Sequence, residues 1–260
     1  DLELGAGVEL EVETAKEPAP SIKKTVKDYL PDLKSADEAA RLAAVQGLLT
    51  MGTEPACDAL VRRWPSEKKG TPVYEAIRDA LPNFKARDVA GELGMLVDSK
   101  SSSDEMLLDG VSILERLGGA DSAATLAKFL NCNRPMVSLS AAGALRSLGD
   151  LSVPHVAVLM KSDSRRGDAI RLLTEIGTEK SAAVLAGYLD RDHKVTPVGQ
   201  AVVDALKTIG KPAVPGLIVQ LDDPGRKLWA AEVLRLITEQ PYGSADKGKW
   251  IEWWRLNKDK

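Results

Sequence analysis

The side chains that most often bind metals or act as nucleophiles are scarce in this sequence and far apart. It contains two histidines, His155 and His193, and two cysteines, Cys57 and Cys132. A zinc site needs three or four such ligands close together, and neither histidine has a third ligand near it in the sequence. We expect the cysteines to lie in helical units two steps apart, beyond the ~7 Å that a disulfide can span. The sequence therefore predicts no metal, no cofactor and two thiols that only fill the core.

Motifs for a particular reaction are missing as well. We find no Gly-x-Ser-x-Gly elbow, no His-Glu-x-x-His pair and no dinucleotide fingerprint. The stretch 177–181 (GTEKS) has some likeness to a phosphate loop, but the upstream Gly and the preceding strand are absent, so we interpret it as a turn between helices. Carboxylate pairs such as Asp222-Asp223 are better placed to accept the free N–H groups at a helix start. We therefore expect a protein that is not an enzyme.

Composition narrows the class of partner. The chain has 260 residues, 44% of them apolar and 28% charged, with a net charge of −3. This balance creates no general attraction to nucleic acid or to an anionic membrane. No apolar run approaches the ~20 residues that a membrane span needs. These values are typical of a soluble globular protein of one large domain or two small ones.

The first twenty residues differ from the rest. They hold six acidic side chains and one basic side chain, which leaves a net charge of +2 for residues 21–260. The stretch 8–14 (VELEVET) alternates apolar and acidic residues with the period of a strand, but no hairpin partner follows it. We interpret 1–20 as an acidic, disordered linker. Because the chain starts with Asp rather than Met, we expect that an upstream segment was removed, and an exported or periplasmic location is our working expectation.

Beyond this linker the sequence repeats. Segments rich in small residues end in an apolar residue followed by glycine, and the glycines Gly118, Gly149, Gly177 and Gly210 are 31, 28 and 33 residues apart. Gly52 lies two periods before Gly118, and Asn83 stands at the intermediate position, where we expect it to adopt the left-handed conformation that ends a helix. A second apolar segment follows each glycine. This pattern predicts seven helical hairpins, which start near Ser35, Thr71, Ser103, Arg134, Asp163, Thr196 and Asp223.

A hairpin of ~30 residues cannot bury its apolar face alone, so the units must stack on one another. The pattern is a helix that ends in Leu-Gly, followed by a helix with an Ala-x-Pro-x-Leu sequence such as 213–217. This pattern resembles short bacterial HEAT-like repeats, which are similar to those of phycobilin lyases and of bacterial scaffold proteins. The resemblance covers residues 34–240 and implies an all-α, right-handed α-solenoid. The sequence departs from the Asp–Arg ladder of such solenoids, because Arg41 and Arg171 have no acidic partner at the repeat spacing. Tetratricopeptide repeats are the nearest alternative, but their Trp-Leu-Gly-Tyr framework is absent.

We therefore divide the chain into a linker (1–20), a repeat solenoid (21–240) and a C-terminal helix (241–260). Pro241 and Gly243 interrupt the chain before this helix, and Trp250, Trp253 and Trp254 share one of its faces. Three large rings can seal the exposed end of the last repeat. The alternative is an aromatic cage for a cation or a sugar.

The candidate binding surface is a column on the second helices. The residues just before the buried Leu or Met of each second helix are Phe129, Leu159, Tyr188 and Gln220, and Arg63 takes this place in the first unit. If the column faces outwards, it offers an apolar patch to a partner helix or peptide on the concave face. If it turns inwards, the same residues pack between repeats. We favour this second alternative, because a helix that has neighbours on both sides buries a wide part of its surface.

Basic residues gather in the loops between units, as Lys68/Lys69, Arg165/Arg166, Arg191/Lys194 and Arg226/Lys227. They suggest a weak phosphate-binding edge, although interleaved aspartates make a solvated loop the simpler interpretation. Our leading hypothesis is a monomeric, non-catalytic scaffold that binds a protein or peptide with its concave face. The alternatives are a ligand-binding or lyase- or glycosylase-like enzyme on the same architecture, and weak nucleic-acid binding along the loops.

Overall fold

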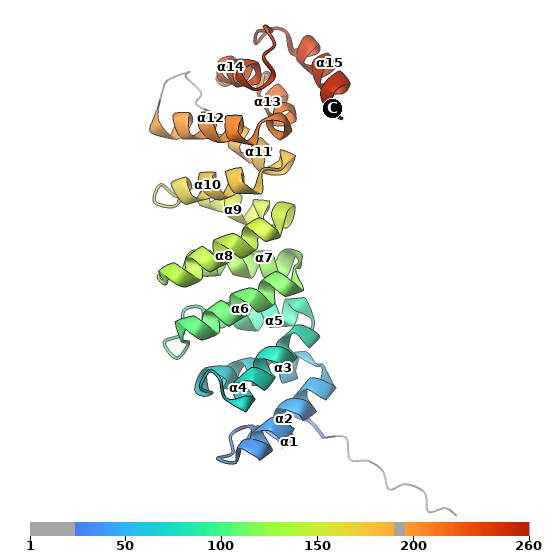
Figure 1. Ribbon diagram of the computed structural model, residues 1–260, viewed down its shortest axis with the longest axis vertical. Helices are drawn as coiled ribbons and strands as arrows, with labels where there is room; N and C mark the ends of the chain where they lie inside the picture. Colours follow the sequence, from blue (N-terminus) through green and yellow to red (C-terminus); the bar gives the residue numbers. More distant parts are fainter. Residues whose placement is uncertain (1–23, 190–195, 260) are drawn as a thin grey trace, which may run out of the picture.

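A computed structural model describes residues 24–189 and 196–259, and the described residues form fifteen α-helices, four short 3₁₀ helices and no β-strand (Figure 1). The α-helices are α1 (Val26–Leu33), α2 (Glu38–Met51), α3 (Glu54–Arg63), α4 (Pro72–Ala80), α5 (Ala86–Leu96), α6 (Asp104–Leu117), α7 (Gly119–Leu130), α8 (Pro135–Ser147), α9 (Val153–Leu159), α10 (Arg166–Ile176), α11 (Glu179–Ala186), α12 (Pro197–Ile209), α13 (Val214–Gln220), α14 (Lys227–Thr238) and α15 (Lys247–Asn257). The 3₁₀ helices are η1 (Trp64–Ser66), η2 (Leu81–Asn83), η3 (Gly149–Leu151) and η4 (Lys211–Ala213).

The helices form an elongated array in two layers (Figure 1). Even-numbered helices from α2 to α14 contact one another in the first layer, and odd-numbered helices from α1 to α15 contact one another in the second. Many helices also pack against a neighbour in the sequence, as α1 does against α2, α7 against α8 and α13 against α14. The all-α prediction is therefore confirmed, and α1 occupies the first position of the second layer.

Local signals explain where the helices begin. The hydroxyl oxygens of Thr71, Ser103 and Thr196 accept backbone N–H groups in the first turns of α4, α6 and α12. At α2 the Asp37 carboxylate accepts the N–H groups of Ala39 and Ala40. These contacts satisfy donors that have no partner within the helix, so the side chain before each helix determines its start.

The predicted glycines adopt left-handed backbone angles at the helix ends, with φ between 56° and 73° at Gly52, Gly118, Gly149, Gly177 and Gly210. The prediction for Asn83 is wrong. Glu239 is the one non-glycine residue with positive φ among those described, and Asn83 ends η2 instead. Its side-chain amide donates to the carbonyl oxygens of Asp79 and Ala80, at 3.0 and 3.1 Å, so a side chain rather than a left-handed residue satisfies this helix end.

Buried apolar side chains form a continuous cluster from Leu33 in α1 to Trp250 in α15. At the C-terminal end, α15 packs against α13, and Trp250 is completely buried. Its indole N–H donates to the carbonyl oxygen of Gly243, and its ring meets Tyr242 edge-on at 5.1 Å between centroids. Trp253 and Trp254 are half-buried and pack against the same cluster.

None of the helices in the described part of the chain combines the length and the apolar character that crossing a bilayer requires. The predicted linker 1–20 lies outside the described residues, as do His193, Arg191 and Lys194.

Candidate interaction surface

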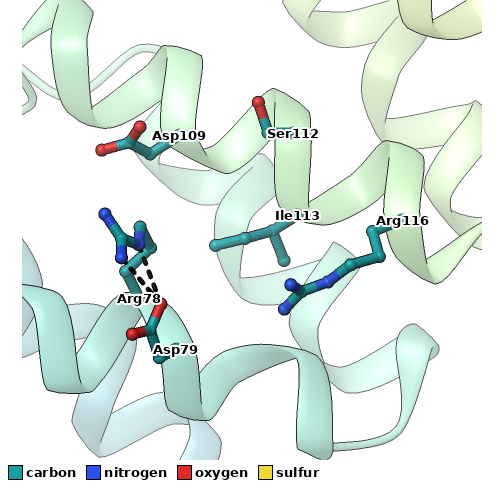
Figure 2. A pocket seen from close by; sticks show the side chains of 6 residues that line it. All are labelled: Arg78, Asp79, Asp109, Ser112, Ile113 and Arg116. Atoms are coloured by element: carbon teal, nitrogen blue, oxygen red, sulfur yellow. Dashed lines mark hydrogen bonds and ion pairs between the residues drawn. The ribbon is translucent and has the colours of Figure 1, made fainter.

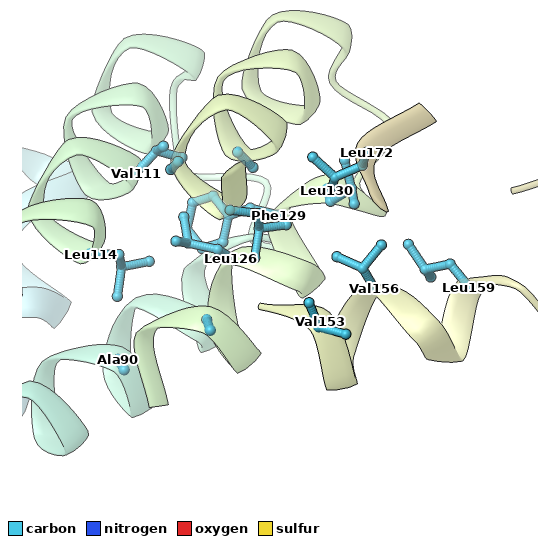
Figure 3. Packing of buried hydrophobic residues seen from close by; sticks show 14 of the residues in the cluster. Ala90, Val111, Leu114, Leu126, Phe129, Leu130, Val153, Val156, Leu159 and Leu172 are labelled. Carbon is cyan, nitrogen blue, oxygen red and sulfur yellow. The ribbon is translucent and has the colours of Figure 1, made fainter. Parts of the chain in front are cut away.

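The structure divides the predicted column on the second helices into two parts. Phe129 is completely buried and Leu159 is 8% exposed, and Figure 3 shows both among packed side chains of neighbouring units. These two side chains follow the second alternative and pack between units, because the helices of the second layer are covered on both flanks and bury a wide arc. Arg63, Tyr188 and Gln220 are half-buried and keep part of their surface accessible.

The outward position of the second layer lies one residue earlier than we expected. Val158 in α9 and Val219 in α13 directly precede Leu159 and Gln220, and they are 61% and 63% exposed. One residue on an α-helix corresponds to a rotation of about 100°, which is enough to exchange a buried side chain for an exposed one. The second layer thus presents isolated apolar side chains rather than a continuous patch in its C-terminal half.

A hollow with a volume of about 790 Å³ lies at the other end of this layer, between α1 and α3. We call it the α1/α3 groove. Its floor is apolar, and five residues form it: Val26, Leu30, Leu33, Pro55 and Ala59. Leu33 and Ala59 are buried, while Val26 and Leu30 are half-buried and line an open space. The volume falls within the ~300–1,000 Å³ that is usual for ligand sites.

Basic side chains surround this floor. Four cationic residues line the α1/α3 groove with one carboxylate, Asp58, which gives the lining a net charge of +3. Asp58 forms an ion pair with Arg62 on the next turn of α3. Lys27 on α1 and Lys34, which directly follows this helix, are exposed and form no ion pair with any residue that the structure describes. The groove is therefore suited to an apolar segment that carries negative charge.

Arg63, a member of the predicted column, reaches the groove from a buried charge cluster. The Glu67 side chain is only 5% exposed and lies between two arginines, bonded to Arg63 and 3.2 Å from the Nε of Arg41. A second guanidinium nitrogen of Arg41 donates to the carbonyl oxygen of Ser35 at 2.9 Å. Arg41 thus has an acidic partner after all, supplied by the loop after η1 rather than by the repeat spacing.

A second hollow, between α4 and α6, is polar and has a volume of about 320 Å³. Figure 2 shows Arg78 and Arg116 on opposite sides of Ile113, with Asp109 and Asp79 near Arg78. Arg78 pairs with Asp79 at 2.9 Å, and Asp109 accepts from the Tyr74 hydroxyl at 2.6 Å and from Lys69 at 2.9 Å. The charges in this hollow balance one another, so it offers no net attraction to an ion.

Acidic side chains line a third hollow, of about 280 Å³, between α5 and α7. Glu92 is half-buried there, and its burial, together with the neighbouring Asp58 carboxylate, raises its pKa to about 7. Among the residues that the structure describes, no group of three side chains is arranged to hold a metal ion.

The basic loops have mainly local partners. Arg166 pairs with Asp163 at 2.7 Å and donates to the carbonyl oxygen of Met160. Arg134 pairs with Asp104 at 2.6 Å and donates to the carbonyl oxygen of Ser102 at 2.8 Å. Arg166 thus binds within its own loop, whereas Arg134 connects the start of α8 with the start of α6.

Two cysteines and one histidine lie in the part of the chain that the structure describes. Cys57 and Cys132 are free thiols, and both are buried. Burial raises the pKa of Cys57 to about 12, which keeps the thiol protonated and unreactive. His155 is half-buried on the short helix α9.

Sequence reasoning missed the α1/α3 groove because it treated residues 21–34 as preceding the first unit. A signal was present: Val26, Leu30 and Leu33 follow the i, i+4, i+7 spacing of a helix face. Thr25 and Asp28 mark its start, since the Asp28 carboxylate accepts both the backbone N–H and the hydroxyl of Thr25.

No protein-family model matches this chain, and none of the curated proteins is similar to it.

Proposed function

We propose that this chain is a non-catalytic interaction scaffold that binds protein or peptide partners. In this proposal the two-layer array is a right-handed α-solenoid of seven short HEAT-like hairpins, and partners approach its second layer, on the concave side. Two observations support the architecture: the alternation of the layers along the chain, and helix starts that coincide with the repeated sequence signals at Thr71, Ser103 and Thr196. Such arrays have extended surfaces that recognise peptides and proteins.

The observation that carries the proposal is the α1/α3 groove, which combines an open apolar floor with two rim lysines that have no ion pair within the described part of the chain. An amphipathic peptide gains free energy by burying apolar side chains between two helices, and charged rim residues orient it. Arg63 lies in this groove, whereas Tyr188 and Gln220 lie farther along the same layer and extend the surface for a longer partner.

A peptide library displayed on phage tests the proposal. We expect selection on the full chain to yield peptides that bind with micromolar dissociation constants and that no longer bind the Val26→Glu chain. This substitution places a carboxylate on the groove floor at the first residue of α1, where the helix dipole favours negative charge and the helix is retained. A matched control is Val219→Glu, which adds the same charge at an exposed position on α13, away from the groove. If the selected peptides bind the Val26→Glu chain as tightly as the unaltered chain, the groove is not the binding site.

A further inference from the structure

The α1/α3 groove leaves apolar surface open between two helices that are otherwise well packed. Val26 and Leu30 on α1 are half-buried, and they face Pro55 and Ala59 of α3 across the groove. An apolar side chain that an occupant buries there is more stable than the same side chain left in water. An occupant must therefore offer apolar side chains on one side.

The rim specifies the charge of that occupant. Lys27 lies on α1 and Lys34 directly follows that helix. Arg62 lies on α3 and is already paired with Asp58, the single carboxylate of the lining. Arg63 is also paired, with Glu67, so the lining cations without an ion pair among the described residues are Lys27 and Lys34. A positively charged occupant would be repelled by these two lysines at short distances. The occupant must therefore be acidic as well as apolar.

One segment of this chain has both properties. Residues 8–13 (VELEVE) alternate three apolar and three acidic side chains, and residues 1–20 have six acidic side chains against one basic. In an extended backbone, alternate side chains point to opposite sides, so Val8, Leu10 and Val12 share one face and the glutamates share the other. This segment lies outside the described residues.

The connection is long enough for the segment to reach the groove. Twelve residues separate Glu13 from Val26, where α1 and the groove begin, and an extended chain of that length covers about 40 Å. The eight residues of α1 extend only about 12 Å, so the linker does not limit how the segment lies in the groove. A short flexible linker gives an effective concentration on the order of 1 mM.

We propose that the α1/α3 groove binds residues 8–13 of its own chain, with Val8, Leu10 and Val12 on the apolar floor and the three glutamates directed to Lys27, Lys34 and Arg62. The inference rests on the proposed function, because it assumes that the groove is a peptide site. It adds a regulatory property: the acidic segment competes with external partners for the same surface. A dissociation constant of about 0.1 mM for the segment would weaken external binding roughly tenfold at that effective concentration.

Anisotropy of a fluorescein-labelled peptide of residues 1–20 measures this competition. The peptide is titrated with the unaltered full chain and with a full chain that carries Leu10→Ser and Val12→Ser, in which the internal segment has lost its apolar face. We expect the altered chain to bind the peptide about tenfold more tightly, because its groove is free. Equal affinity for the two chains, or no binding by either, would overturn the proposal.

Charge-reversal variants show whether the binding occurs in the groove. Adding Lys27→Glu and Lys34→Glu to the altered chain should weaken its affinity for the peptide at least tenfold. The matched control pair, Lys100→Glu and Lys207→Glu, lies at exposed positions outside the groove lining and should change this affinity less than twofold. Affinity should also fall as salt rises, and a peptide with glutamines in place of Glu9, Glu11 and Glu13 should bind weakly at every salt concentration. Retention of peptide binding after the Lys27→Glu and Lys34→Glu reversal would contradict the assignment.

Two further results separate this inference from its alternatives. If library peptides bind in a way that depends on Val26 while the peptide of residues 1–20 does not bind, the proposed function holds and the internal occupant is wrong. If neither kind of peptide binds, both proposals fail. If sedimentation shows a concentration-dependent dimer that the Leu10→Ser and Val12→Ser changes abolish, the segment occupies the groove of a second copy, and the proposal of binding within one chain is overturned.

Discussion

The packing of α1 depends on a glycine in α2, and replacing that glycine is the sharpest test of the structure. A Cβ atom added at Gly47 would lie 2.2 Å from Cε1, 2.5 Å from Cζ and 2.8 Å from the hydroxyl oxygen of Tyr29 on α1. Ordinary contacts between carbon atoms are ~3.5–4.0 Å, so the Tyr29 ring must move. Since α1 forms one wall of the α1/α3 groove, Gly47→Ala perturbs both stability and the candidate site.

Two opposing effects determine how much Gly47→Ala changes the free energy of unfolding. Alanine in a helix interior is favoured over glycine by about 1 kcal/mol, whereas forcing extra volume into a packed contact costs about 1–3 kcal/mol. We therefore expect Gly47→Ala to lower the free energy of unfolding by up to about 2 kcal/mol and to speed amide exchange in α1. Gly143→Ala in α8 is the matched control, because no neighbouring atom lies within 4 Å of the added Cβ. It should raise Tm by about 2–4 °C for a domain of this size.

A double variant isolates the cause. In a chain that already carries Tyr29→Ala, the ring is gone, and Gly47→Ala should become stabilising by about 1 kcal/mol because only helix propensity remains. Urea unfolding of the four chains measures the coupling. The reasoning is refuted if Gly47→Ala stabilises the unaltered chain as Gly143→Ala does, or if it destabilises the chain equally with and without the Tyr29 ring.

Substitutions at Glu239, Glu92 and Glu67 give three separate tests. Glu239 is exposed at the end of α14 with φ of 58°, so Glu239→Gly should stabilise the chain by about 1 kcal/mol, which a thermal melt measures, and Glu239→Ala should not. The pKa of the Glu92 carboxyl group is raised from 4.5 to about 7 in the folded chain, so the folded state holds this proton more tightly than the unfolded state does. The stability that comes from protonated Glu92 is therefore lost as pH rises from about 4.5 through 7. Glu92→Gln should therefore make the chain more stable than the parent at pH 8 and reduce the difference at pH 5, as measured by urea unfolding at both values. Glu67→Gln removes the carboxylate that Arg41 and Arg63 share, and it should lower the free energy of unfolding by about 2 kcal/mol. Arg63→Gln should lower it less, because the Arg41–Glu67 pair remains in place. Equal losses of unfolding free energy for the two variants would show that the cluster does not act as a unit.

Much of the fold follows from local patterns. Side chains such as Thr71, Ser103 and Thr196 satisfy the free N–H groups of the helix that follows them, and glycines such as Gly177 end helices at left-handed angles. Both effects act within a few residues, so the sequence alone predicts the order and starts of most helices. The exceptions, Asn83 and α1, show the limit of that reasoning: a side chain can replace a glycine at a helix end, and a short helix outside the repeat escapes a search for periodicity.

The candidate site could not be predicted in the same way, because its parts meet only through packing. The period of the second helices identifies an apolar stripe, but the rotation of each helix against its neighbours decides that Phe129 and Leu159 are buried while Val158 is exposed. The pairing of Arg41 with Glu67, and the groove formed by α1 and α3, depend on residues that are separated by some twenty to forty positions. By itself the sequence determined which segments are helical, because hydrogen bonds and caps are local. Only the tertiary structure decided which surfaces remain open, because burial depends on where other helices lie.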